Sequence, residues 1–174
     1  MIFVQTEPTP NPNALKFKSH QQLVGEGSVW YDIDLALKSS EFVKKLFRIA
    51  GVRFVLLQDN TVTITKFSQW PWEEISHKIK NVISTDSIYI ENGETDQYCT
   101  DEICCAVRKI VQEEIRPSIQ LDGGDIKFIK FKDGVAEIKL HGSCWGCPNN
   151  ESTLGAITNK LATRIPEVKQ VRIV

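Results

Sequence analysis

A polar stretch near the middle of the chain constrains the fold most, because it separates two apolar patterns. Residues 91–96 read Glu-Asn-Gly-Glu-Thr-Asp, which is rich in turn formers and has no apolar side chain to bury. The chain has 174 residues, so a division here leaves two parts of roughly half that length, each enough for a small domain. We therefore expect an α+β protein of two small domains, 1–88 and 100–174, joined by a linker at 89–99.

The charge and the hydropathy of the chain exclude two classes of partner. Lys and Arg number 21 and Asp and Glu 22, a formal net charge of -1, whereas nucleic-acid binding driven by charge needs a basic surplus. Apolar runs such as 54–57 (Phe-Val-Leu-Leu) are far shorter than the ~18 residues of a membrane-spanning helix. We expect no nucleic-acid partner and no membrane insertion.

The first half has the pattern of a small α+β module. Three prolines within residues 6–13 exclude a helix there and predict an extended segment after a strand at 2–5. We expect this segment to protect a sheet edge, the alternative being a docking surface for a partner. The other expected elements are strands at 14–17, 52–57 and 62–66, a helix at 35–48, and a helix from about Gln69 to Ser84.

The second half predicts the order α-β-β-α-β, with a three-stranded sheet. Asp101 or Thr100 can cap an amphipathic helix that is expected to stop before Pro117. Asp133 and Gly134 predict a two-residue hairpin turn, because both readily take positive φ angles. The expected strands are 126–132, 135–140 and 168–174, and the last helix carries Leu154, Ile157, Leu161 and Ile165.

Residues 141–151, His-Gly-Ser-Cys-Trp-Gly-Cys-Pro-Asn-Asn-Glu, carry the strongest chemical signal. They form a loop before the last helix. Cys144 and Cys147 are separated by two residues, so both thiols can face one soft metal centre, and the neighbouring glycines permit the tight backbone that this requires. Thiolates select zinc, copper(I) or iron–sulfur clusters over magnesium and calcium.

Three interpretations of Cys144 and Cys147 are open at this point: a metal centre, a dithiol redox site, or two thiols in a turn without metal. Thioredoxin-like domains place such a pair before most of their sheet, whereas only one helix and one strand are expected after this pair. A zinc ion or a cubane cluster commonly takes four protein ligands, twice what the motif supplies. The metal interpretation therefore predicts that a second chain contributes its own pair.

Other polar residues give weaker signals. Cys104 lies on the apolar face of its helix and Cys105 about 100° further round, so this adjacent pair diverges and, with Cys99, is a poor ligand set. His141 is expected to be exposed at a strand end, and residues 122–125 (Asp-Gly-Gly-Asp) to form a turn, since the spacing of a phosphate-binding loop is missing. No Ser-His-Asp order and no HExxH pair is present, so we expect no enzyme.

Both halves resemble a known family. Residues 122–148, with Asp-Gly-Gly-Asp followed by Gly-Ser-Cys-Trp-Gly-Cys-Pro, resemble the NifU-like C-terminal domain, and residues 5–17 (Gln-Thr-Glu-Pro-Thr-Pro-Asn-Pro-Asn-Ala-Leu-Lys-Phe) look like the N-terminal domain of Nfu-type iron–sulfur carriers. The resemblance implies a carrier that binds a [4Fe-4S] cluster between two subunits through Cys144 and Cys147 and transfers it to apo-proteins. Zinc is a possible substitute for the cluster.

The resemblance also implies partners and a location. It implies a homodimer when the cluster is bound, upstream assembly machinery, and apo iron–sulfur recipient proteins, such as those of lipoate synthesis and respiration. It implies a bacterial cytoplasmic protein, or a mitochondrial matrix protein if the chain is a processed eukaryotic form. A structural or regulatory zinc module and a dithiol oxidoreductase remain the alternatives, and Cys99, Cys104, Cys105 and His141 receive no role.

Overall fold

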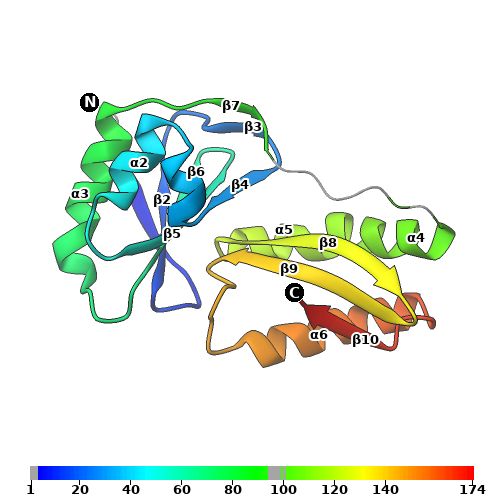
Figure 1. Ribbon diagram of the computed structural model, residues 1–174. Helices are drawn as coiled ribbons and strands as arrows, with labels where there is room; N and C mark the ends of the chain where they lie inside the picture. Colours follow the sequence, from blue (N-terminus) through cyan, green and yellow to red (C-terminus); the bar gives the residue numbers. More distant parts are fainter. Residues whose placement is uncertain (1–3, 94–98, 100) are drawn as a thin grey trace. The chain divides into compact units, whose positions relative to one another are not determined.

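The computed structural model of the chain describes residues 4–93, 99 and 101–174 (Figure 1). The chain divides into two compact units, Met1–Glu94 and Thr95–Val174. Each unit combines helices with its own sheet, which confirms the expected α+β class with two small domains. No helix among the described residues is long and apolar enough to cross a bilayer.

The first unit is built on a five-stranded sheet with the strand order β1-β2-β6-β5-β4. Its neighbouring strands are antiparallel, including β5 and β6, which correspond to the strands predicted at 52–57 and 62–66. The strands are β1 Gln5–Pro8, β2 Ala14–Lys18, β4 Ser28–Tyr31, β5 Val52–Gln58 and β6 Thr61–Lys66, and the helices are α1 Ile33–Leu37, α2 Glu41–Phe47 and α3 Trp72–Thr85.

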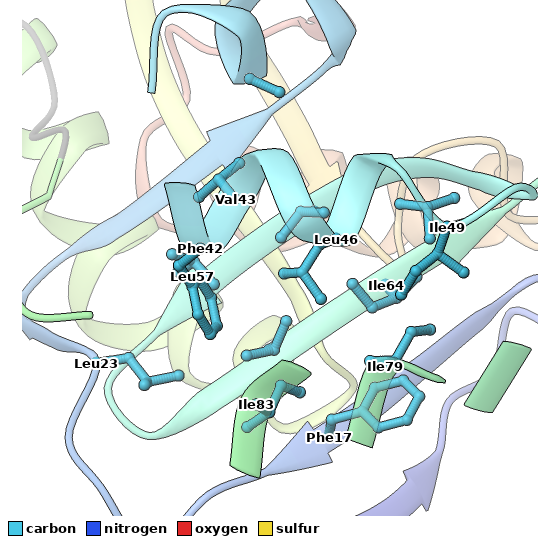
Figure 2. Close-up of a cluster of buried hydrophobic side chains, with 14 of the residues drawn as sticks. Phe17, Leu23, Phe42, Val43, Leu46, Ile49, Leu57, Ile64, Ile79 and Ile83 are labelled. Carbon is cyan, nitrogen blue, oxygen red and sulfur yellow. The ribbon is translucent and has the colours of Figure 1, made fainter. Parts of the chain in front are cut away.

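Helices α2 and α3 bury their apolar faces in the core of the first unit (Figure 2). Val43 and Leu46 of α2, like Ile79 and Ile83 of α3, are three or four residues apart and therefore lie on one side of their helix. They join Ile64 of β6 in one buried cluster. Burial of this apolar surface stabilises the unit.

The proline-rich segment forms the edge of the five-stranded sheet, as predicted. Pro8 pairs with Leu15 in the outermost strand, where a missing N–H group costs the sheet no hydrogen bond. The turn that follows is held by side chains from β6 and α3. Lys66 Nζ donates to Asn13 Oδ1 at 3.1 Å, and the Trp72 indole N–H donates to the Pro12 carbonyl at 3.0 Å.

Two predictions about the first half are wrong. The helix expected at 35–48 is two helices, α1 and α2, because the Ser40 hydroxyl accepts a hydrogen bond from Val43 N and so caps a new helix. The strand expected at 2–5 does not include Val4, and the first strand of the described residues is Gln5–Pro8; residues 1–3 lie outside the described part of the chain.

A small parallel sheet was not predicted. Strand β3 (Val24–Glu26) pairs with β7 (Ile90–Asn92), so two segments far apart in the sequence lie side by side. Strand β7 lies inside the range 89–99 that the sequence analysis assigned to a linker. The first compact unit therefore includes part of that range.

The second unit has a three-stranded sheet with the order β10-β9-β8, and its helices and strands follow the predicted order. Asp133 and Gly134 take φ angles of 52° and 79° between β8 and β9, which confirms the hairpin turn. Strand β10 runs parallel to β9 after the crossover through α6. The elements are α4 Glu102–Ile110, a π-helical turn η1 Val111–Ile115, α5 Arg116–Leu121, β8 Gly124–Lys132, β9 Val135–Gly142, α6 Asn150–Arg164 and β10 Gln170–Ile173.

The prediction that the first helical segment of this unit stops before Pro117 is wrong. The segment continues to Leu121. The wider π-helical turn η1 precedes the proline, which occupies the first turn of α5. A π turn changes the path of the backbone where proline supplies no N–H group and its ring needs room. The helical segment therefore accommodates the proline instead of ending before it.

A buried ion pair joins α5 to the beginning of β8. The Asp125 carboxylate is fully buried, and Arg116 contacts it with two nitrogens, Nε to Oδ1 at 2.7 Å and Nη2 to Oδ2 at 2.9 Å. Such a two-point contact fixes the relative orientation of both side chains. It positions the start of β8 beneath the loop that carries Cys144.

Removing Arg116 should destabilise the second unit strongly. Arg116→Leu leaves the Asp125 carboxylate buried without this partner, and we expect the free energy of unfolding to fall by about 3–5 kcal/mol. Urea denaturation measures the loss. Arg164→Leu is the matched control, because Arg164 pairs with Glu114 at the surface and its side chain is 61% exposed, so its loss should be below about 1 kcal/mol. Equal losses in the two variants would contradict this view of Arg116.

Candidate metal centre

Figure 1 shows the loop between β9 and α6. This loop carries Cys144 and Cys147 and is anchored at Ser143. Ser143 is buried, its hydroxyl donates to the Asp122 carbonyl at 2.6 Å, and its N–H donates to the Gly123 carbonyl at 3.1 Å. Two hydrogen bonds thus tie the residue before Cys144 to the turn before β8. The sequence predicted this turn but not its contact with the loop.

The Cys144 sulfur lies directly on the backbone of Gly124. A Cβ atom at position 124 would collide with Cys144 Sγ and would lie 3.1 Å from a methyl carbon of Ile119. Gly124 also faces Gly142 across the β8–β9 ladder, so two residues without side chains leave room for the thiol. Glycine is needed here for space.

The second half of the loop is open to solvent. Gly146 has a φ of 64°, and no atom outside its immediate neighbours lies within 4 Å of the position of a Cβ. Trp145 is exposed, and Cys147 is half-buried. A bulky ligand or a second protein can therefore reach the loop from this side.

Burial raises the pKa of the Cys144 thiol to about 11. A hydrogen bond with Ser143 acts against this rise, whereas the nearby Cys147, Asp122 and Asp125 add to it. Cys144 is therefore a neutral thiol at pH 7. A soft metal ion would displace the proton, because thiols coordinate metals as thiolates.

The described residues offer Cys144 and Cys147 no further ligand group. Within residues 4–93, 99 and 101–174, no three Cys, His, Asp or Glu side chains are grouped so that they could hold a metal ion. His141, three residues before Cys144, is buried in β9 opposite Asp125, so the expectation that it is exposed is wrong. Its place in the strand is set by the sheet register.

The other three cysteines lie at the start of α4. Cys104 is buried in the core and Cys105 is exposed, which confirms that this adjacent pair diverges. Cys99, however, lies close to both. The helix periodicity of the sequence could not reveal this, because Cys99 precedes the helix.

Family models match both halves of the chain. Residues 107–172 match the NifU-like domain, and residues 4–88 match the N-terminal domain of scaffold protein Nfu/NifU. The human protein named "NFU1 iron-sulfur cluster scaffold homolog, mitochondrial" is 33% identical over 180 residues, which covers 98% of this chain and 71% of that protein. The chain belongs to the Nfu family of NifU-like proteins.

Insect members of the Nfu family are similarly related. The mitochondrial NFU1 iron-sulfur cluster scaffold homologs of Drosophila persimilis and Drosophila grimshawi are 35% and 36% identical, over 98% and 97% of this chain. The chain spans 64% and 60% of the length of these two relatives. A solution structure of a NifU-like protein from Saccharomyces cerevisiae is similar over 54% of this chain and 87% of its own, with 24% identity and a TM-score of 0.48.

Gly124→Ala should strain the contact with Cys144. The new methyl group overfills the space beside Sγ, and we expect the free energy of unfolding to fall by about 1–3 kcal/mol in urea denaturation. Gly155→Ala is the matched control, because position 155 lies within α6 with nothing near its Cβ, and this change should stabilise the unit by up to ~1 kcal/mol. An unchanged stability of Gly124→Ala would show that Cys144 has room to move.

The reactivity of Cys144 should depend on pH in a characteristic way. With a pKa of about 11 only the small thiolate fraction reacts, so the rate of alkylation by iodoacetamide should rise about tenfold per pH unit from about pH 8 to 10. The measurement uses Cys147→Ser protein, with quantification of the peptide containing Cys144. The same protein unfolded in urea is the control. There the alkylation rate of Cys144 should level off above the ordinary cysteine pKa of about 8.5. A folded-state plateau near pH 9 would contradict the effect of burial.

Proposed function

We propose that this protein carries an iron–sulfur cluster, bound between two copies of the chain through Cys144 and Cys147 of each. Membership of a family whose relatives are named iron-sulfur cluster scaffold homologs supports the cargo. The observation that carries the proposal is the loop itself, which presents two thiols beside open space and no further ligand group among the described residues.

The number of ligands favours a shared [4Fe-4S] cluster. Such a cluster is commonly held by four cysteine thiolates, and the loop supplies two. Two chains related by a two-fold axis would bring together four thiols from identical loops. The half-buried Cys147 and the open space beside Gly146 leave this side accessible to a second copy.

The state of Cys144 suits a site that loads and releases its cargo. Without metal, the raised pKa keeps the thiol protonated and unreactive. Iron binding displaces the proton, and loss of the cluster to a recipient protein restores the neutral thiol. Exchange of cysteine ligands between carrier and recipient provides a route for transfer that needs no catalytic residue, and we propose that the protein is not an enzyme.

A dithiol oxidoreductase is a weaker proposal for the same pair. An attacking thiol in such enzymes usually has a lowered pKa, whereas burial raises that of Cys144 to about 11. The structural or regulatory zinc module is distinguished by its metal content.

Apo iron–sulfur proteins and the upstream assembly machinery are the partners we propose. The names of the relatives support a mitochondrial location, for which we propose the matrix, with the bacterial cytoplasm as the alternative.

Removing either ligand should abolish cluster binding. After anaerobic reconstitution with iron and sulfide, the unmodified protein should hold about two irons and two sulfides per chain, the share of one four-iron cluster between two chains. Cys144→Ser and Cys147→Ser should each lower both contents at least about tenfold, because each removes two of the four thiolates in a dimer. Iron and acid-labile sulfide analysis of the desalted protein measures the result.

Cys105→Ser is the matched control, since it removes an exposed thiol outside the loop and should leave both contents unchanged. Full iron and sulfide in Cys144→Ser would contradict the ligand assignment. Stoichiometric zinc without acid-labile sulfide, in protein purified without oxygen, would contradict the cluster and support the zinc module.

A further inference from the structure

The three cysteines outside the loop gather at the start of α4. Cys99, Cys104 and Cys105 lie close together. Asp101 caps the N-terminus of α4. Its carboxylate accepts a hydrogen bond from Cys104 N at 2.8 Å, and its carbonyl accepts a hydrogen bond from Cys105 N at 3.0 Å. This cap fixes the first turn of α4, and with it the backbone of both helical cysteines.

The three thiols differ in their access to solvent. Cys104 is 7% exposed and packs in the core with Val107 and Val111. Cys99 is half-buried and packs against the same core. Cys105 is exposed. A small reagent dissolved in water therefore reaches Cys105 first.

Cys99 is the member that contacts the other two. Burial raises the pKa of Cys99 to about 12, and the neighbouring Cys104 and Cys105 side chains add to this rise. Its protonated sulfur is a poor first target for an oxidant. Cys99 nevertheless lies close to Cys105, and closeness is the first requirement for a disulfide between them.

We propose that this cluster is a second thiol site, at which hydrogen peroxide oxidises Cys105 and Cys99 then closes a Cys99–Cys105 disulfide. The site is separate from the Cys144–Cys147 loop. The proposal does not depend on what that loop binds.

The reaction balances in two steps. The Cys105 thiolate sulfur attacks one peroxide oxygen, the O–O bond breaks, and hydroxide leaves and is protonated to water, with a sulfenic acid formed at Cys105. The Cys99 sulfur then attacks the Cys105 sulfur, the S–O bond breaks, and the Cys99 proton leaves with the hydroxide as a second water. Two thiols are oxidised and one peroxide is reduced.

Two other products of the cluster have less support. Successive residues of a helix point about 100° apart, which disfavours a disulfide between Cys104 and Cys105. Among the residues that the structure places, no group of three potential ligands is arranged to hold a metal ion, and the three thiols are included in that statement. Disulfide formation needs only two sulfurs, and Cys99 has a partner that is open to the reagent.

Peptide mapping of the full chain tests the proposal. Reduced, metal-free protein is treated with hydrogen peroxide, its remaining thiols are blocked with N-ethylmaleimide, and it is cleaved after glutamate. Cleavage after Glu102 separates Cys99 from Cys104 and Cys105, so the disulfide should appear as peptides 95–102 and 103–113 joined and released by reduction. Cys144 and Cys147 lie in peptide 138–151, where their own oxidation is read separately.

Single variants assign the two sulfurs. Cys99→Ser and Cys105→Ser should each lower the joined peptides at least about tenfold, whereas Cys104→Ala should retain them. The proposal is overturned by an absence of joined peptides in the unmodified protein, or by their persistence in Cys105→Ser. The proposal is also overturned if the joined peptides are lost in Cys104→Ala but retained in Cys105→Ser. Accumulation of sulfinic acid at Cys105 without a disulfide would overturn it as well.

Discussion

The Cys144 sulfur packs on the bare backbone of Gly124, and the geometry of the whole loop follows from this contact. Ser143 holds the adjacent backbone to the turn before β8 with two hydrogen bonds. Beneath them, the ion pair between Arg116 and Asp125 fixes the start of β8 against α5. One thiol is thereby held rigidly and kept neutral, while the rest of the loop, from Trp145 onward, stays open.

This arrangement explains how one loop can both protect and release a cluster. A half-buried, protonated thiol such as that of Cys144 resists oxidation when it has no metal, because the thiolate is the reactive form. Two such loops supply the four thiolates that a cubane cluster needs, while either loop alone supplies half. A shared cluster is then exposed whenever the two chains separate. In the proposed arrangement, release of the cargo is thereby coupled to dissociation of the two chains.

The sequence predicted the features that depend on neighbouring residues. The Asp133–Gly134 turn is one, because positive φ angles are a property of those two residues themselves. The pairing of β3 with β7, the room that Gly124 leaves for Cys144, and the nearness of Cys99 to Cys105 depend on segments brought together only by the fold. The paired glycines at 123 and 124 and a charged Asp125 at the start of an apolar strand were the available signals for the site beneath Cys144.

Native mass spectrometry of the reconstituted protein without oxygen tests the central claim most directly, because it weighs chains and cargo in the same particle. We predict a species with the mass of two chains and one four-iron, four-sulfide cluster, beside metal-free single chains. A single chain that retains a complete cluster, or a pair of chains that carries two, would contradict a cluster shared through Cys144 and Cys147.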